Sequence, residues 1–213
     1  MEGPLKCIGW SGRPGGIDMT SRLVSMAGLM PGAKVLDIGC GQGDTVLHLR
    51  SAYGYDAAGI DCATGPGQAT GLIREGRGEE IPFPGGSMDG ILMECSFSLM
   101  EDPDRVLQEC RRVLKPTGKL LLADLYARGE PVVLAGQLGR LDTKETVLSR
   151  LEDHGFRVTS FGDATHALQT LMGQMILDHG ADAFYGGLGV TPGLMKTVKG
   201  GYFLAVAERG AEG

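Results

Sequence analysis

The sequence predicts an α/β domain built around a parallel sheet. Short apolar runs alternate with segments in which apolar residues recur at helical spacing. The first run, 34–38, is apolar almost throughout, as expected of a parallel strand that is covered on both faces, and a turn with three glycines follows it. Strands that alternate with helices predict a parallel sheet whose ligand binds beyond the carboxyl ends of the strands.

The individual elements follow from the same periodicities and from the residues that start and stop helices. Strands are predicted at 34–38, 56–60, 88–94, 119–125, 156–161 and 201–207. Helices are predicted at 19–29, 44–52, 68–74, 103–114, 142–154 and 164–178. Asp102-Pro103 is a strong helix start, because Asp caps the first turn and Pro suits the first helical position. Asp142 and Glu145 are predicted to form a capping box. The glycine-rich stretch after 178 is predicted to be a loop.

Composition limits the class of protein. The 213 residues are 42% apolar and predict a single globular domain, 1–213, with a core of ordinary size. A net charge of −6 disfavours nucleic acid as a partner. The sequence contains neither an apolar leader nor a run of about 20 apolar residues. We therefore expect a cytoplasmic protein that does not associate with a membrane. None of the five cysteines forms a C-x-x-C pair, which favours reduced thiols and predicts no metal site.

The spacing of the glycines in the turn restricts the cofactor. A dinucleotide fingerprint is G-x-G-x-x-G, with the pyrophosphate at the helix N-terminus. Here the glycines are Gly39, Gly41 and Gly43, and Asp44 stands where the third glycine of that fingerprint would fall. Its carboxylate would repel a pyrophosphate at that position. A nicotinamide dinucleotide is therefore disfavoured.

What remains is an acid followed by glycines two residues apart, and residues 35–44 resemble motif I of the class I S-adenosylmethionine-dependent methyltransferases. Three further segments resemble the subgroup of ubiquinone and menaquinone methyltransferases: Arg13-Pro14-Gly15-Gly16, Glu80-Ile81-Pro82-Phe83 with Met88-Asp89, and Arg112-Val113-Leu114-Lys115-Pro116-x-Gly118. The resemblance covers residues 13–125. It implies a Rossmann-like sheet, mostly parallel with an antiparallel last strand and helices on both faces. It also implies S-adenosylmethionine as cofactor, S-adenosylhomocysteine as product and a small-molecule methyl acceptor.

The resemblance also implies which residues meet the cofactor: Asp37, Gly39, Cys40, Gly41, Gly43, Asp61, Cys62, Glu80, Ile81 and Glu94. The glycines would pass under the methionine part, and Asp37 would lie near its ammonium group. Asp61 would accept both ribose hydroxyls, since a carboxylate has two oxygens to offer. Its alternative role is that of a turn residue before the Gly65-Pro66-Gly67 interruption.

Two features depart from the family pattern. The chain between Asp61 and Glu79 is short, so that the second helix and third strand must be trimmed. Arg77 stands where relatives commonly have the acid that contacts adenine. Glu79 or Glu80 would then take that contact while Ile81 stacks on the ring, or both glutamates are simply solvated.

The methyl acceptor is less constrained. Transfer from a sulfonium is an in-line displacement, for which the protein must position the nucleophile and exclude water, and a base is needed only for a poor nucleophile. Candidate catalytic residues follow the strands at 88–94 and 119–125, and they are Glu94, Cys95 and Tyr126. Cys95 resembles a metalloid-binding thiol of arsenite methyltransferases, but Ala135 stands where a second thiol is expected.

Alternatives therefore stay open for the role of Cys95, for the function of the chain and for the role of residues 163–199. Cys95 could be an inert buried thiol, since Cys62 and Cys7 do not complete a set of soft ligands with it. The leading function is methylation of a small molecule; the alternatives are an arsenite or other soft-acceptor methyltransferase and a non-catalytic regulator that binds S-adenosylmethionine. Residues 163–199 are long for a connection and predict a lid with 184–187 as its tip, or else a homodimer contact.

Overall fold

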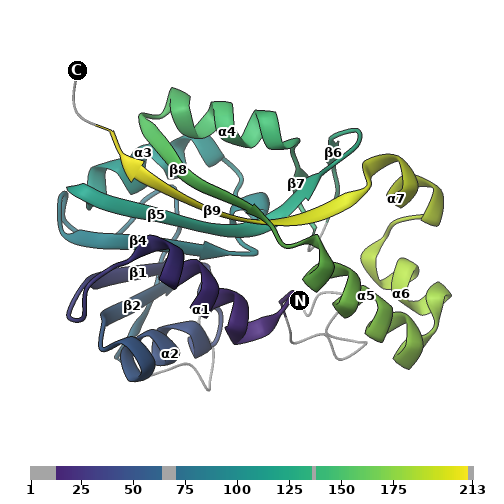
Figure 1. Cartoon of the computed structure of the whole chain (residues 1–213), viewed down its shortest axis with the longest axis horizontal. Coiled ribbons are helices and arrows are strands. Elements are labelled where there is room, and N and C mark those ends of the chain that lie inside the picture. Colours follow the sequence, from purple (N-terminus) through teal and green to yellow (C-terminus); the bar gives the residue numbers. More distant parts are fainter. Residues whose placement is uncertain (1–12, 64–70, 136–137, 211–213) are drawn as a thin grey trace.

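The computed structural model describes residues 13–63, 71–135 and 138–210, and a seven-stranded sheet runs through them. Its strands lie in the order β3-β2-β1-β4-β5-β9-β8 (Figure 1). Their bounds are β1 Lys34–Ile38, β2 Asp56–Asp61, β3 Ile73–Glu75, β4 Met88–Glu94, β5 Leu114–Ala127, β8 Phe156–Asp163 and β9 Gly200–Arg209. The first five are parallel, whereas β9 is antiparallel to both of its neighbours. The expected mostly parallel sheet with an antiparallel last strand is confirmed.

Helices cover both faces of this sheet. They are α1 Gly16–Ala27, α2 Asp44–Tyr53, α3 Pro103–Val113, α4 Lys144–Asp153, α5 Thr165–His179, α6 Ala181–Leu188 and α7 Pro192–Val198. Figure 1 shows α1 and α2 on one side of the sheet and α3 and α4 on the other. A short 3-10 helix, η2 Phe97–Leu99, follows β4, and the small strands β6 Val132–Val133 and β7 Arg140–Leu141 pair after β5.

The alternation of side chains along the strands produces two cores. Leu36 and Ile38 of β1 pack in the core under α3 and α4, whereas Val35 packs in the core under α1 and α2. In β4, Ile91 packs in the core under α3 and α4, and Leu92 packs in the core under α1 and α2. Because successive residues of a strand point to opposite faces, a strand buried on both faces is apolar along most of its length. Burial on both faces explains the continuous apolar runs in the sequence.

Two sequence-based predictions of secondary structure are wrong in detail. Ile73 to Glu75 form the strand β3, not the end of a helix, because this short segment pairs in parallel with the edge of β2. Residues 68–70 of that predicted helix lie outside the described residues. Helix α4 is capped by Thr143, whose Oγ1 accepts a hydrogen bond from the Thr146 N–H at 3.3 Å. Asp142 instead accepts from Arg140 Nε at 2.7 Å.

The predicted loop after α5 is also wrong, since residues 181–188 and 192–198 are helical. Phe184 and Leu188, one turn apart, are buried in a third core with residues of α5 and β7. Thr191 caps α7, and Pro192 occupies its first turn. Phe184 is fully buried and is therefore not the tip of an exposed loop. In Figure 1 the three helices α5 to α7 sit beyond the end of β5 that leads to β6.

None of the helices in the described part of the chain combines the length and apolar character that crossing a bilayer requires.

Candidate functional site

The glycine turn joins β1 to α2 and exposes backbone where a side chain would obstruct it. Gly39, Gly41 and Gly43 all have positive φ angles, of 76°, 53° and 88°. A Cβ atom on Gly39 would lie 2.6 Å from the Cβ of Ser96, which is too close for any larger residue. The Gly39 N–H donates to the Ile60 carbonyl at 2.8 Å, which ties the turn to the end of β2. Glycine is therefore required by conformation and by space at the start of this turn.

Two buried acids lie beside the turn. Asp37 belongs to β1 and is 3% exposed, and Glu94, the last residue of β4, has a side chain that is also 3% exposed. The pKa of Asp37 is raised to about 8, first by burial and second by the nearby carboxylate of Glu94. Burial likewise raises the pKa of Glu94. Desolvated carboxyl groups near one another favour a cation between them.

Glu94 is held by side chains from three different parts of the chain. The Thr20 hydroxyl of α1 lies 3.0 Å from both carboxylate oxygens, and Thr45 Oγ1 of α2 donates to Oε2 at 3.3 Å. Arg13, just before α1, places Nη2 3.4 Å from Glu94 Oε2 and donates to Thr20 Oγ1 at 2.6 Å. The Nε atom of Arg13 is buried and has no hydrogen-bond partner within the residues that the structure describes. The guanidinium thus retains an unused donor in this cluster.

Asp61 closes the other side of the turn. Its Oδ2 accepts from the Gly41 N–H at 2.8 Å, and its Oδ1 accepts from the Ala63 N–H at 2.9 Å. Each carboxylate oxygen has two lone pairs, so each can accept a further donor. The backbone amides hold this carboxylate at the end of β2, facing the turn.

A cavity of about 920 Å³ continues from the end of β2 toward α3. The cavity is lined by Cys62, Glu75, Gly76, Arg77, Glu80, Ile81, Pro82, Arg105, Glu109 and Arg112. Arg77 lies 2.8 Å from Glu101 and 3.4 Å from Glu79, so Glu79 is turned toward Arg77 and does not line the cavity. Glu80 is exposed at the cavity wall, and Ile81 is buried beneath it.

The candidate catalytic side chains of Cys95 and Tyr126 do not converge. Cys95 has a positive φ of 53°, and its Sγ lies 3.5 Å from the Tyr202 hydroxyl in the core under α1 and α2. Burial, followed by the carboxylate of Asp124, raises the pKa of the Cys95 thiol. Tyr126 packs in the opposite core, where its hydroxyl donates to Asp163 Oδ2 at 2.7 Å. Cys95 and Tyr126 therefore lie on opposite faces of the sheet.

This architecture has known counterparts. Residues 36–122 match a protein family described as a methyltransferase domain. YcgJ, an uncharacterized methyltransferase of Bacillus subtilis (strain 168), is 33% identical over 130 residues, which cover 56% of this chain and 48% of that relative. This match and the relative support the expected resemblance to the class I S-adenosylmethionine-dependent methyltransferases. The chain spans about half the length of YcgJ.

Solved structures show the same class I methyltransferase fold. The [4+2]-cyclase SpnF has a TM-score of 0.75 at 22% identity, with 92% of this chain and 81% of that chain covered. Geranyl diphosphate C-methyltransferase from Streptomyces coelicolor A3(2), in complex with Mg²⁺, geranyl diphosphate and S-adenosyl-L-homocysteine, has a TM-score of 0.76 at 15% identity, with 91% and 79% covered. At these identities the likeness shows the fold.

In this chain the sequence-predicted cofactor residues fall into two neighbouring groups. The first surrounds the turn: Asp37, Gly39, Cys40, Gly41, Gly43, Asp61 and Glu94. The second lines the cavity: Cys62, Glu80 and Ile81. The Cys40 thiol fills the space above Gly59, because a Cβ atom added to Gly59 would lie 2.5 Å from the Cys40 sulfur. Burial raises the pKa of the Cys40 thiol to about 12. Tyr126 lies in neither group.

Sequence reasoning missed the residues that hold Glu94. Arg13 belongs to a segment that resembles the family, yet no role was predicted for it. Thr20 and Thr45 lie in the first halves of α1 and α2 and carry no motif of their own. Asp124, in the predicted strand 119–125, is buried and accepts from both the N–H and the hydroxyl of Ser98 at 2.8 Å, which ties η2 to β5.

Proposed function

We propose that this chain binds S-adenosylmethionine and transfers its methyl group to a small-molecule acceptor. The observation that carries the proposal is the pair of buried acids, Asp37 and Glu94, beside a turn made of glycines. Such a pair favours a cation, and the ammonium group of the cofactor's methionine part supplies one. The turn leaves room for that part to lie directly on the backbone.

The remaining parts of the cofactor would extend along the site toward α3. Asp61 would accept the ribose hydroxyls through the lone pairs that its two backbone amides leave free. The adenine would enter the cavity above Ile81. Arg77 offers only donors and is already engaged with Glu79 and Glu101, so it cannot accept from the adenine amino group. Glu80, exposed at the cavity wall, would accept in its place.

The acceptor would bind beside Cys95, under the module α5 to α7. An added Cβ atom on Gly15 would lie 3.4 Å from the Cβ of Ala167, so the start of α1 and the start of α5 are close neighbours. We propose that this module covers the acceptor and excludes water, which is the main requirement for displacement at an activated methyl group. A homodimer contact is the competing role, and light scattering of the purified chain distinguishes the two.

The thiols give little support to a soft acceptor. Cys110 is fully buried in the core under α3, whereas Cys40 and Cys95 pack in the opposite core. Cys62 is exposed at the cavity, and Cys7 lies outside the described residues. Arsenite is therefore an outcome of the test and not the proposal. Serine in place of Cys95 should abolish transfer only if a soft acceptor binds there.

Two measurements test the proposal in sequence. Calorimetric titration with S-adenosylhomocysteine should show binding, and titration with NAD should not; no heat with S-adenosylhomocysteine would refute the proposal. Incubation with methyl-labelled S-adenosylmethionine and a fractionated metabolite extract should then label a small molecule. Binding without any labelled product would favour the regulator. The likeness to SpnF, which is named a cyclase, is a reason to test transfer separately from binding.

A further inference from the structure

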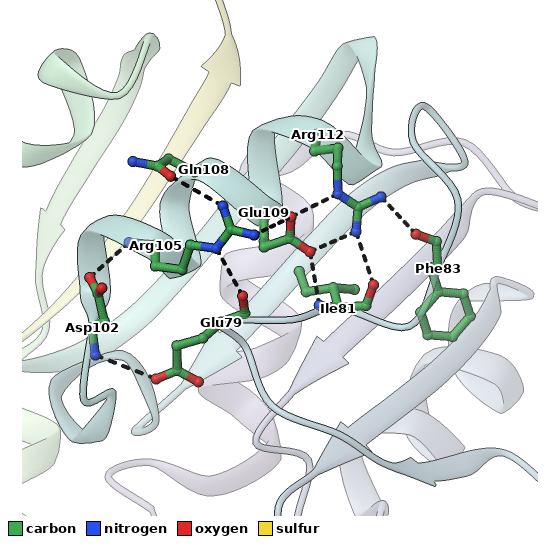
Figure 2. Close-up of polar contacts among 8 residues, drawn as sticks. All are labelled: Glu79, Ile81, Phe83, Asp102, Arg105, Gln108, Glu109 and Arg112. Atoms are coloured by element: carbon green, nitrogen blue, oxygen red, sulfur yellow. Dashed lines mark hydrogen bonds and ion pairs between the residues drawn. The ribbon is translucent and has the colours of Figure 1, made fainter.

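The loop that carries Glu80 and Ile81 is held from outside by one face of helix α3. Arg105, Glu109 and Arg112 are spaced four and three residues apart, so they project from the same side of the helix (Figure 2). All three also line the cavity. The contacts of this face go to the main chain of the loop, so they do not depend on the side chains there.

Glu109 and Arg112 make the strongest part of this contact. The Glu109 side chain is 7% exposed, and its carboxylate accepts from the Ile81 N–H at 2.9 Å. Arg112 donates to the same carboxylate through Nε at 2.8 Å and Nη2 at 2.6 Å. Arg112 then reaches the loop itself, with Nη2 2.9 Å from the Ile81 carbonyl and Nη1 3.0 Å from the Phe83 carbonyl. The guanidinium thus uses its planar fork on both a carboxylate and two carbonyls.

Arg105 extends the contact to the start of the loop. Its Nε donates to the Glu79 carbonyl at 3.2 Å, and its Nη2 lies 3.7 Å from Glu109. Figure 2 shows these bonds converging on the loop from the helix. Main-chain atoms of residues 79, 81 and 83 are fixed in this way, which leaves Glu80 between two anchored residues. The position of its backbone is then set by α3.

We infer that the face Arg105–Glu109–Arg112 of α3 is a positioning device that presents Glu80 and Ile81 to the adenine end of the cofactor. The inference rests on the proposed function. The three residues act through the loop and need not touch the cofactor themselves. Their loss should therefore weaken the contribution of the adenine base to binding and leave the contribution of the methionine and ribose parts unchanged.

The sharpest test replaces Arg112 by lysine, which keeps the charge but cannot bond to Glu109 and two carbonyls at once. The affinities of S-adenosylhomocysteine and of S-ribosylhomocysteine, which lacks the base, are measured by calorimetry or competition. The dissociation constant of S-ribosylhomocysteine divided by that of S-adenosylhomocysteine reports the contribution of the base. We expect Arg112→Lys to lower this ratio about tenfold, in line with the cost of small displacements in a binding site.

The control is the neighbouring residue on the same helix. Arg111 also donates to backbone carbonyls, those of Gly155 at 2.7 Å and Gly210 at 3.3 Å, but these lie on the side of α4 and β8. Arg111→Lys should lower the melting temperature and leave the ratio unchanged. If Arg112→Lys fails to fold, Glu109→Gln replaces it, because glutamine still accepts from the Ile81 N–H but carries no charge for Arg112.

The outcomes separate this inference from the proposed function. If the unaltered chain binds no S-adenosylhomocysteine, the proposed function fails. If the unaltered chain binds S-adenosylhomocysteine, the effect of Arg112→Lys, or of Glu109→Gln in its place, on the ratio decides. A ratio that stays at the wild-type value, or changes no more than in Arg111→Lys, overturns the positioning role while the proposed function stands.

Discussion

Replacing Asp37 by asparagine should stabilise the folded chain, and the gain should grow with pH. The pKa of Asp37 is about 8 in the folded chain, against an ordinary value of 3.8, because the carboxyl group is buried beside Glu94. Between these two values the unfolded chain has released a proton that the folded chain still holds. The stability associated with this group is therefore fully present below pH 4 and is lost as the pH rises through 8. Asparagine keeps the shape of the protonated acid and does not titrate.

The magnitude follows from the difference between the two pKa values. A difference of about 4 corresponds to about 6 kcal/mol at the plateau, at roughly 1.4 kcal/mol for each pKa unit. This value is the upper bound for Asp37 titrating alone, and Arg13, which favours the ionised form, already acts on it. We expect Asp37→Asn to gain between about 2 and 6 kcal/mol at pH 9 and close to nothing at pH 4.

Urea unfolding of both proteins at pH 4, 5, 6, 7, 8 and 9 measures this difference, with fluorescence and circular dichroism as independent probes. A matched control is Asp89→Asn. Hydrogen bonds from Lys115 and the Lys34 N–H outweigh partial burial and lower the pKa of Asp89, so this substitution should lose stability at neutral pH. If Asp37→Asn is no more stable than the parent chain at pH 9, the reasoning about the buried acid is wrong.

The same titration has a consequence for binding. A cationic ammonium beside Asp37 favours the ionised carboxyl group, so binding of S-adenosylhomocysteine near pH 7 should release a proton. Calorimetry in two buffers that differ in ionisation enthalpy measures this release directly. Asp37→Asn should bind more weakly at pH 8 and release none from this site.

Three further substitutions probe the turn, the end of β2 and a helix end. Gly39→Ala should destabilise the chain by about 2 kcal/mol or more, because alanine is strained at φ 76° and its Cβ would meet Ser96; a loss under 0.5 kcal/mol in urea unfolding would contradict this. Asp61→Ala should weaken S-adenosylhomocysteine binding at least about tenfold, as charge-assisted hydrogen bonds are lost, and an unchanged affinity in calorimetry would mean that the ribose assignment is wrong. Thr143→Ala should cost about 1 kcal/mol through loss of the α4 cap, and equal denaturation midpoints would show that the cap contributes nothing.

Local pattern predicted most of the sheet because burial on both faces leaves a continuous apolar run. The run at 88–94 was found with the bounds that β4 has. β3 was missed because three residues are too few to show a period, and the strand exists only through its pairing with β2. The antiparallel direction of the last strand came from the resemblance to a family. Pairing between distant segments has no signature in local periodicity.

Helix α6 shows where propensity was the wrong guide. Gly186 and Gly187 lower the helical propensity of this segment by about 1 kcal/mol each relative to alanine. Burial of Phe184 and Leu188 in the third core outweighs that cost, since a fully buried aromatic or leucine side chain contributes roughly 1.5 to 3 kcal/mol. A partner surface decides the structure here, and the sequence of the segment alone does not contain it.

The candidate site divides in the same way. The glycine turn was recognisable because its requirement for positive φ is local, and Asp61 because it ends a strand. The cluster around Glu94 was not, because Thr20 and Glu94 are 74 residues apart and meet only in the folded chain. The α3 face is similarly hidden: the sequence places Arg112 in a motif, and its contacts with the Ile81 and Phe83 carbonyls depend on how the helix docks.

The charges around the turn bear on the choice of cofactor more directly than the glycines do. Asp37 and Glu94 are buried beside the turn, and Asp44 is the first residue of α2, where the turn ends. Three acids surround a backbone that could otherwise receive phosphate, and Arg13 is committed to one of them. A pyrophosphate placed here would face repulsion that a single guanidinium does not offset. A ligand with an ammonium group would instead lower the free energy of the two buried acids that destabilise the free chain at neutral pH. The cost of burying Asp37 and Glu94 would thus be recovered when a cation binds, which would tie the stability of the chain to the charge of its cofactor.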